Sequence, residues 1–193
     1  MRSNIMKKDT VNIIIGDSIT YGVGDTEYFG WVNRLKKTHP TDYYFNLGIP
    51  GQNSNDIVFR FDNEISARYN KEDNFRIIYA FGIKDALLLN DNKINKEIFV
   101  NNLEKIITTT KKYTNNIYFL GLLPVDTTVR KNYQESNILL IDNLIQDISQ
   151  KENINYLKMK NVIELTDLSD GLHPNNIGHE KICQYIYKNI ILK

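Results

Sequence analysis

The chain has 193 residues, of which 41% are hydrophobic and 24% are charged, proportions that fit one globular domain. Its 24 basic and 23 acidic side chains leave a net charge of +1, so electrostatics give no reason to expect nucleic acid or an anionic membrane as a partner. A single cysteine, Cys183, excludes an internal disulfide, and no stretch approaches the roughly 18 apolar residues of a membrane span. We therefore expect one cytoplasmic domain over residues 1–193, in which residues 1–10 form a loose N-terminal extension and not a signal peptide.

Short apolar runs alternate along the chain with longer segments in which apolar residues recur at helical spacing. Runs rich in β-branched and aromatic residues predict strands at 11–16, 42–48, 75–81, 117–123 and 154–157. Between and after them, apolar residues at helical spacing predict helices at 29–37, 54–68, 96–113, 132–151 and 174–191. This alternation predicts an α/β fold: a five-stranded parallel sheet with helices on both faces, a three-layer α/β/α sandwich of flavodoxin-like type.

Three details of this fold can also be predicted from the sequence. The strand at 75–81 is the most continuously apolar, which indicates a central position buried on both faces. Ser54 is expected to cap the helix that begins there. The last helix is expected to turn Ile177 and Ile182 inward and to bury Cys183.

The stretch Gly16-Asp17-Ser18-Ile19-Thr20 directly follows the first predicted strand. It therefore presents a serine hydroxyl at the carboxyl end of a strand, where open α/β sheets bind their ligands. A surface loop in which Ser18 only caps a turn is the alternative interpretation. Asp17 is interpreted as a turn former.

The stretch Asp170-Gly171-Leu172-His173-Pro174 supplies what such a serine needs. A serine hydroxyl is a weak nucleophile until a base takes its proton, and histidine titrates in the right range. Asp170, three residues before His173, is predicted to orient the imidazole, and Asp167 is the less compactly spaced alternative. The other histidines, His39 and His179, are predicted to be exposed and inert. No metal-ligand spacing or glycine-rich nucleotide motif occurs, so we expect no metal and no cofactor.

Over nearly its whole length, and in the same block order, the chain resembles the SGNH hydrolases, the GDSL-type esterase/lipase and acylhydrolase group. Residues 16–20 resemble the first block, 46–51 (Asn-Leu-Gly-Ile-Pro-Gly) the second and 170–174 the last, and Gly30-Trp31-Val32 after Gly24-Asp25 is similar to one branch of small bacterial members. The resemblance implies an SGNH fold with Ser18 as nucleophile and Asp170 and His173 as acid and base. It also implies an oxyanion hole formed by the backbone of Ser18 and Gly51.

The third block departs from the family pattern. Where the family has Gly-x-Asn-Asp, with the asparagine as an oxyanion donor, this chain has Gly82-Ile83-Lys84-Asp85. Lysine is also a donor, and a charged one, but its stem is flexible and its ammonium strongly hydrated. Lys84 is therefore expected either to serve the oxyanion hole, to point into solvent or to pair with Asp17 or Asp85. Asn53 is a second candidate for the missing donor.

These observations predict a serine esterase or acylhydrolase that forms an acyl-enzyme with a small-molecule ester. Few long insertions are present to build a lid, so short acyl groups or acetylated sugars are expected. Asp17, Asn53, Asp85 and Tyr21 are assigned to the candidate substrate pocket; Tyr28, Phe29 and Trp31 are candidates for its mouth, with core packing the favoured role of Trp31.

Two alternatives remain open. One is a catalytically weak relative that binds an ester or glycan, because Lys84 replaces the usual asparagine. The other is a flavodoxin-like domain in which residues 16–20 bind an anion at a helix N-terminus. The sequence determines neither the acyl group, the alcohol nor the oligomeric state.

Overall fold

The computed structural model describes residues 9–91 and 93–192, so most of the predicted N-terminal extension lies outside the described residues. Five parallel strands form one sheet in the order β2-β1-β3-β4-β5. They are β1 (Thr10–Gly16), β2 (Tyr43–Gly48), β3 (Asn74–Ala80), β4 (Ile117–Leu120) and β5 (Asn155–Leu157). The predicted parallel sheet is confirmed, and so is the central place of the third strand.

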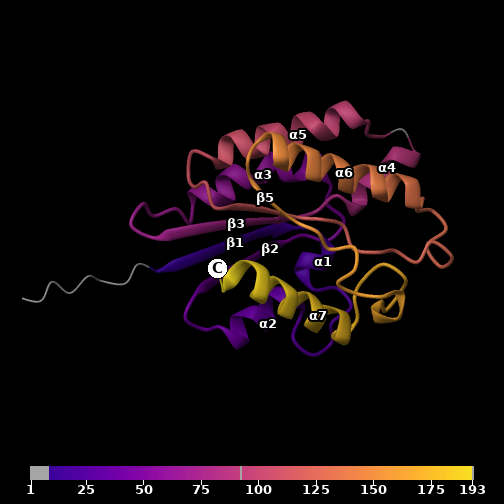
Figure 1. The fold of residues 1–193 in the computed structure, drawn as a ribbon, viewed down its shortest axis with the longest axis horizontal. Helices are drawn as coiled ribbons and strands as arrows, with labels where there is room; N and C mark the ends of the chain where they lie inside the picture. The colour runs from indigo at the N-terminus through magenta and orange to yellow at the C-terminus, as the bar shows by residue number, and fades with distance from the viewer. Residues whose placement is uncertain (1–8, 92, 193) are drawn as a thin grey trace, which may run out of the picture.

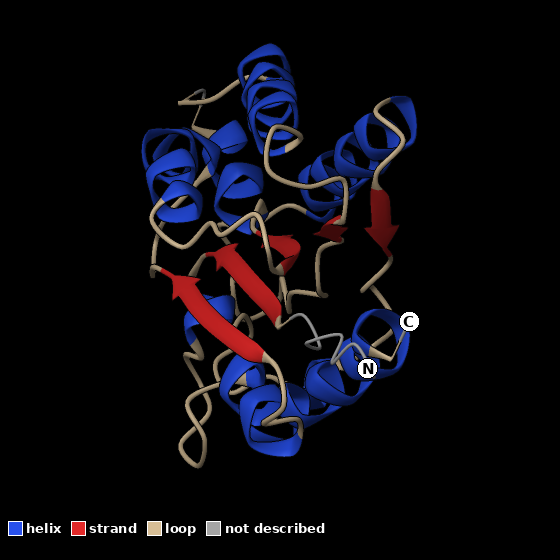
Figure 2. Cartoon of the chain, turned by 90° about the vertical axis from the view of Figure 1, so that its left-hand side faces the viewer, coloured by secondary structure: helices blue, strands red, loops and turns tan. Residues whose placement is uncertain are grey.

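Helices cover both faces of this sheet (Figure 1; Figure 2 shows the layers from the side). On one face lie α3 (Ser54–Ser66), α4 (Ile83–Asn90), α5 (Lys96–Thr110) and α6 (Glu135–Lys151). On the other lie α2 (Trp31–Thr38) and α7 (Asn176–Ile186), which continues as the π-helical turn η2 (Tyr187–Ile191). The short elements α1 (Ser18–Tyr21), α4 and the 3-10 turn η1 (Leu165–Asp167) were not among the predicted helices, because a helix of one or two turns shows too few residues for its period to be seen.

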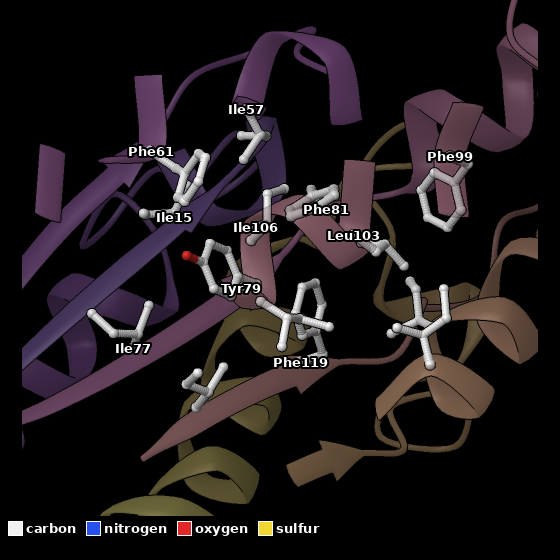
Figure 3. Packing of buried hydrophobic residues seen from close by; sticks show 14 of the residues in the cluster. Ile15, Ile57, Phe61, Ile77, Tyr79, Phe81, Phe99, Leu103, Ile106 and Phe119 are labelled. Atoms are coloured by element: carbon white, nitrogen blue, oxygen red, sulfur yellow. The ribbon is translucent and has the colours of Figure 1, made fainter. Parts of the chain in front are cut away.

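The strands carry apolar side chains on both faces. In β1, Ile13 and Ile15 pack into the larger cluster beneath α3, α5 and α6, whereas Ile14 packs into the cluster formed with α2 and α7. Figure 3 shows the larger cluster, where the rings of Tyr79 and Phe119 stack with their centroids 4.8 Å apart. Because successive residues of a strand face opposite sides, a sheet covered twice needs apolar residues at nearly every position, as the continuous runs predicted.

Two predictions about helix ends are wrong. Asn53, not Ser54, is the N-cap of α3, and its side chain accepts from the N–H of Asn55 at 2.8 Å. The last helix begins at Asn176, because Asn175 caps it by accepting from the N–H of Gly178. Ile177 consequently lies on the outer side of the first turn, where it is 61% exposed. Cys183 is buried, as predicted.

The strand order places a crevice where the candidate residues lie. From β1 the chain moves outward to β2 and then returns across β1 to β3, so the direction of winding reverses between β1 and β3. At such a switch point the loops beyond the strand ends diverge to opposite faces and leave an opening at the carboxyl edge. Ser18 follows β1, Gly51 follows β2 and Lys84 follows β3.

Candidate active site

Ser18 is the first residue of α1, directly after the turn that ends β1. Asp17 caps α1 by accepting from the N–H of Ile19 at 2.9 Å, and Gly22, with φ of 111°, ends it in the left-handed conformation. Gly16 is needed for the close approach of β3, since a Cβ there would lie 2.3 Å from the carbonyl oxygen of Ala80. The turn is therefore fixed on both sides, and Ser18 itself remains half-buried.

Asp170 and His173 share a compact turn before α7. Asp170 Oδ1 accepts from the N–H groups of Leu172 (3.0 Å) and His173 (2.8 Å), while its Oδ2 lies 2.9 Å from His173 Nδ1. Gly171 allows the turn through a φ of 81°. Burial alone would raise the pKa of Asp170, but the hydrogen bonds from His173 and Leu172 lower it to about 2. The carboxylate is therefore charged at neutral pH.

The structure brings the two ends of the chain together at this edge. His173 Nε2 lies 3.0 Å from Ser18 Oγ, although the two residues are 155 positions apart in the sequence. Ser18, His173 and Asp170 thus form a continuous hydrogen-bonded chain, with the serine hydroxyl at one end and the carboxylate at the other. This is the geometry in which an imidazole can accept a proton from a hydroxyl while a carboxylate stabilises the resulting cation.

Asp167, the alternative orienting acid, is placed elsewhere. Its Oδ2 accepts from the N–H of Glu164 at 2.8 Å and from Lys181 Nζ at 2.7 Å. It closes the η1 turn and ties it to α7, so both of these contacts lead away from His173. Asp170 is the only one of the two aspartates that contacts the imidazole within the described residues.

The second block places Gly51 in the loop between β2 and α3. Gly51 has a φ of 81°, is exposed and has open space where a side chain would be. Asn53, the predicted substitute donor, is engaged in a capping box: its side chain accepts from Asn55, and its own N–H donates to Asp56 Oδ2 at 2.9 Å. The side-chain amide oxygen of Asn53 is therefore committed to capping α3, whereas the donor role expected of Asn53 belongs to its amide nitrogen.

The third block separates its two polar residues. Lys84 lies half-buried in the first turn of α4, and within the described residues it has no hydrogen bond or ion pair, so the expected pairing with Asp17 or Asp85 is not formed. Asp85 is fully buried and accepts from the N–H of Ser54 (3.1 Å) and from its hydroxyl (2.6 Å). Asp85 thus joins the third block to the second.

Asp17 and Asp85 are buried carboxyl groups just beyond the carboxyl ends of β1 and β3. Burial raises the pKa of Asp17 to about 7, and the charge of Asp85 acts in the same direction. Burial likewise raises the pKa of Asp85 to about 6. Asp17 also borders a partly open cavity of about 40 Å³ whose other walls include Trp31, Phe81 and Met159; neither Ser18 nor His173 lines it. Both carboxyl groups are kept from solvent.

The aromatic candidates for the pocket mouth divide into two groups. Tyr21 is 54% exposed at the end of α1, and Phe29 is 69% exposed. Tyr28 packs its ring against Arg34, and Trp31 is buried in the core, as its favoured interpretation predicted. Of the four, Tyr21 lies closest to Ser18 along the chain.

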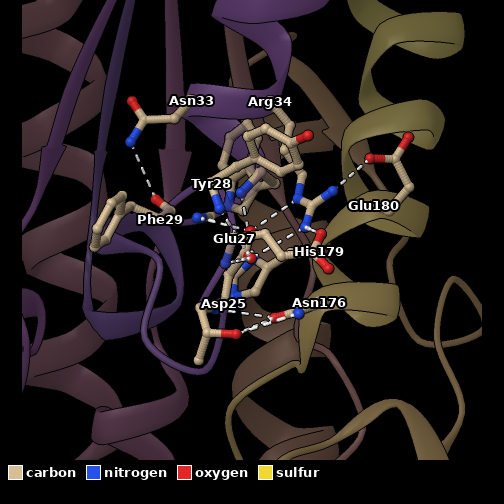
Figure 4. Close-up of polar contacts among 12 residues, drawn as sticks. Asp25, Glu27, Tyr28, Phe29, Asn33, Arg34, Asn176, His179 and Glu180 are labelled. Carbon is tan, nitrogen blue, oxygen red and sulfur yellow. Dashed lines mark hydrogen bonds and ion pairs between the residues drawn. The ribbon is translucent and has the colours of Figure 1, made fainter.

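His179 is buried, which corrects its predicted exposure. Its Nδ1 accepts from the N–H of Trp31 (3.3 Å), so its Nε2 carries the proton and donates to the carbonyl of Val23 (3.0 Å). It belongs to a buried network that we call the Asp25 cluster (Figure 4), which consists of Asp25, Arg34, His179 and Glu180. The prediction is wrong because His179 precedes Ile182 and Cys183 by three and four residues, so it lies on the same inner face of α7, which packs on α2. His39 ends α2 as predicted, with its ring stacked on Tyr187.

One residue beside the triad was not predicted at all. Arg130, in the loop between β4 and α6, forms an ion pair with the Asp170 carboxylate. No motif surrounds it, and 40 residues separate it from Asp170. No pattern in the sequence marks it.

Between residues 9 and 192, leaving out 92, no group of three or more His, Cys, Asp or Glu side chains is arranged to hold a metal ion. The helices of the same residues include none that is long and apolar enough to cross a membrane.

Comparison with known proteins gives one family and one fold. The model of the GDSL-like lipase/acylhydrolase family matches residues 14–181, whereas no curated protein matches the chain. A lipase/acylhydrolase from Enterococcus faecalis is similar in structure, with a TM-score of 0.77 and 23% identity over 93% of this chain and 94% of that one. A G-D-S-L family lipolytic protein from Veillonella parvula gives a TM-score of 0.78 and 15% identity, over 94% and 98% of the two chains. A variant of an acetyl xylan esterase from Geobacillus stearothermophilus gives 0.72 and 17%, over 94% of each. At these identities the solved structures show the fold.

Proposed function

The chain belongs to the GDSL-like lipase/acylhydrolase family and is thus a carboxylic ester hydrolase; from this premise we propose that it works through a serine acyl-enzyme on esters of small acyl groups. The observation that carries the proposal is the hydrogen-bonded chain from Ser18 Oγ through His173 to Asp170, with distances of 3.0 and 2.9 Å. The three-residue spacing between Asp170 and His173 also occurs in a structurally similar esterase. Two variants of the Geobacillus stearothermophilus acetylxylan esterase, described as catalytic mutants, replace an aspartate and a histidine three positions apart.

In the proposed reaction, Ser18 Oγ attacks the ester carbonyl carbon while His173 Nε2 takes the hydroxyl proton. The carbonyl π electrons move onto oxygen, and the tetrahedral oxyanion is stabilised by the backbone N–H groups of Ser18 and Gly51. Collapse of this intermediate breaks the bond to the alcohol oxygen, which receives the proton from His173. Water then attacks the acyl-enzyme in the same way and releases the acid. Asp170 stays ionised throughout and holds the imidazole in the required tautomer.

The short loops around Ser18 favour a small acyl group. The loops that carry Ser18 and Gly51 are short and lie directly on strand ends, so no long cover extends over the nucleophile from them. We assign short acyl groups, acetyl first among them, and leave the alcohol to the open rim beside Tyr21.

Lys84 supports one second candidate, a relative that binds an ester or glycan and turns it over weakly. Without the family's asparagine amide, the two backbone N–H groups are the remaining oxyanion donors, and loss of one such donor lowers the rate by about a hundred- to a thousand-fold. The anion-binding alternative is disfavoured by α1 itself, because the Asp17 carboxyl group already occupies the N-cap position where an anion would bind.

A fluorophosphonate probe tests the proposal directly. We expect one covalent adduct, which peptide mapping assigns to Ser18, and no adduct in Ser18→Ala, whose thermal unfolding should match that of the wild type. Hydrolysis of a short-chain aryl ester measured in parallel separates the two candidates: the weak relative forms the adduct slowly and shows little turnover. Labelling of a different serine, or ester turnover that survives in Ser18→Ala, would refute the mechanism.

A further inference from the structure

The triad carboxylate has a second side-chain partner, the guanidinium of Arg130. Arg130 Nη2 donates to Asp170 Oδ2, the same oxygen that faces His173 Nδ1, and Arg130 Nε donates to the backbone carbonyl of Asp170 at 2.9 Å. The guanidinium thus grips both the side chain and the main chain of one residue. Its planar fork can hold two acceptors at once, which a lysine ammonium cannot do with the same geometry.

The loop that carries Arg130 is built to present it. Asp126 Oδ1 accepts from the N–H of Thr128 at 3.0 Å, and the Asp126 carbonyl accepts from the N–H of Arg130 at 2.7 Å, which together close a tight turn. The same turn reaches the acid–base segment directly, because the N–H of Asp126 donates to the carbonyl of Gly171 at 2.8 Å. Val129 closes the contact, since a Cβ added at Gly171 would lie 3.0 Å from the Val129 side chain.

We infer that Arg130 is a positioning residue of the active site, which fixes the Asp170 carboxylate and lowers the basicity of the Asp170–His173 pair. The inference rests on the proposed function, since it assigns a role within the same triad. Because the guanidinium shares Oδ2 with the imidazole, its positive charge opposes protonation of His173 while it keeps Asp170 ionised. The free imidazole base is consequently present at lower pH than it would be without Arg130.

The contribution of Arg130 has to be distinguished from that of other titratable groups in this part of the protein. Burial raises the pKa of Tyr133 to about 12, and the Asp17 charge acts in the same direction, so Tyr133 is neutral throughout the relevant range. Asp17, with its pKa raised to about 7, titrates within that range. His179, on α7, has a lowered pKa and is held neutral by burial. None of these groups contacts Asp170, so a change that follows Arg130 alone identifies its contribution.

The test compares Arg130→Gln, which removes the charge, with Arg130→Lys, which keeps the charge without the fork. The matched control is Lys131→Gln, an exposed neighbour whose replacement removes one positive charge from the same segment. Two readouts are measured against pH: kcat/KM on a short-chain aryl ester, and the NMR titration of the His173 ring, which is assigned by its loss in His173→Ala.

For Arg130→Gln we expect the acidic limb of kcat/KM and the midpoint of the His173 titration to move upward together by about 0.5 to 1 pH unit. Loss of orientation should also lower kcat/KM at the optimum by about 5- to 50-fold. Arg130→Lys should leave the midpoint within about 0.2 units of the wild type while kcat/KM still falls. Lys131→Gln should change neither readout.

Two outcomes overturn the inference. An unmoved His173 titration in Arg130→Gln would show that the ion pair has no influence on the acid–base pair. A lower melting temperature with an unchanged pH profile would show that Arg130 is only structural. Because the ring titration does not depend on turnover, it reports on Arg130 even in a protein that forms no Ser18 adduct, which is the result that refutes the proposed function.

Discussion

The Ser18 triad, taken together with Arg130, and the Asp25 cluster use the same three residue types for opposite purposes. Both contain an aspartate, an arginine and a histidine, and each lies where the N-terminal third of the chain meets the segment around α7. The Asp25 side chain is fully buried and Arg34 is only 7% exposed, whereas 39% of the Asp170 side chain is exposed. The two sites therefore differ in solvent access, although they share these three residue types.

They differ also in how completely their polar atoms are paired. Asp25 accepts from Arg34 Nε at 2.7 Å, from Arg34 Nη2 at 3.0 Å and from three backbone N–H groups, those of Glu27, Tyr28 and Gly30. Burial by itself would raise the pKa of Asp25, but these hydrogen bonds hold it well below its usual range. Both nitrogens of His179 are paired with the backbone. In the triad, the outer nitrogen of His173 meets only a serine hydroxyl, which is free to react.

The comparison shows what distinguishes a structural cluster from a reactive one. When every donor and acceptor is paired inside the protein, the cluster fixes geometry, here by joining the loop after α1 to α2 and α7. When one hydrogen bond leads to a half-buried hydroxyl at a sheet edge, the same residues can exchange a proton with a substrate. Three predictions follow from this difference.

The largest effect is expected from exchanging the two histidines for alanine. His173→Ala should lower kcat by a factor of about 10³ to 10⁶, because the serine loses its base, and its free energy of unfolding should stay within about 0.5 kcal/mol of the wild type. His179→Ala should leave kcat close to that of the wild type and lower the free energy of unfolding by about 2 to 4 kcal/mol. Steady-state kinetics and urea unfolding measure the two quantities.

His39→Ala is the control for this pair, since His39 lies at the end of α2 and stacks on Tyr187 away from both sites. It should retain nearly full activity. If all three variants lost activity equally while remaining folded, the distinction between a reactive and a structural histidine would be wrong.

A smaller effect is expected at Lys84, where the third block departs from the family pattern. In Lys84→Asn an amide replaces the ammonium, and a gain in kcat of about 3- to 10-fold is expected, because a partly restored oxyanion donor acts mainly in the transition state. Lys96→Asn, on the exposed first turn of α5, is the matched control for charge.

The sign of the Lys84 effect is informative. A fall in kcat would mean that the ammonium already serves as a charged donor, and a fall in affinity alone would mean that it binds an anionic part of the substrate. A kinetically silent substitution would place Lys84 outside the oxyanion site altogether.

The smallest effect is a pH dependence of stability that comes from His179. Burial lowers the pKa of His179 below its ordinary value of 6.5, so below that pH the unfolded chain binds a proton that the folded chain excludes. Stability contributed by the neutral ring is therefore fully present above about pH 6.5 and is lost as the pH falls, with a slope of at most about 1.4 kcal/mol per pH unit. Urea unfolding between pH 5 and 8 measures it.

His179→Gln isolates this slope, because Asp17 contributes the opposite one. The raised pKa of Asp17, about 7, adds stability at low pH that is lost as the pH rises. The difference between the wild type and His179→Gln removes the common Asp17 contribution. If that difference did not vary with pH, burial would not hold His179 in its neutral form.

The sequence by itself determined the features that depend on neighbours in the chain. The period of the apolar residues predicted the five strands and the sheet, because a strand covered on both faces must be apolar at almost every position. The Asp170–His173 turn was predictable for the same reason: its hydrogen bonds span two or three residues, and Gly171 permits the turn they require.

The tertiary structure decided the features that depend on residues far apart. Whether Ser54 caps α3 or binds Asp85, which face of α7 carries His179 inward, and which arginine meets Asp170 are all set by contacts across 31 to 156 positions. Such contacts form only when the strand order and helix packing are fixed, and no local period encodes them. The sequence thus indicated which residues could react, whereas packing decided which histidine is closed off and which is left beside Ser18.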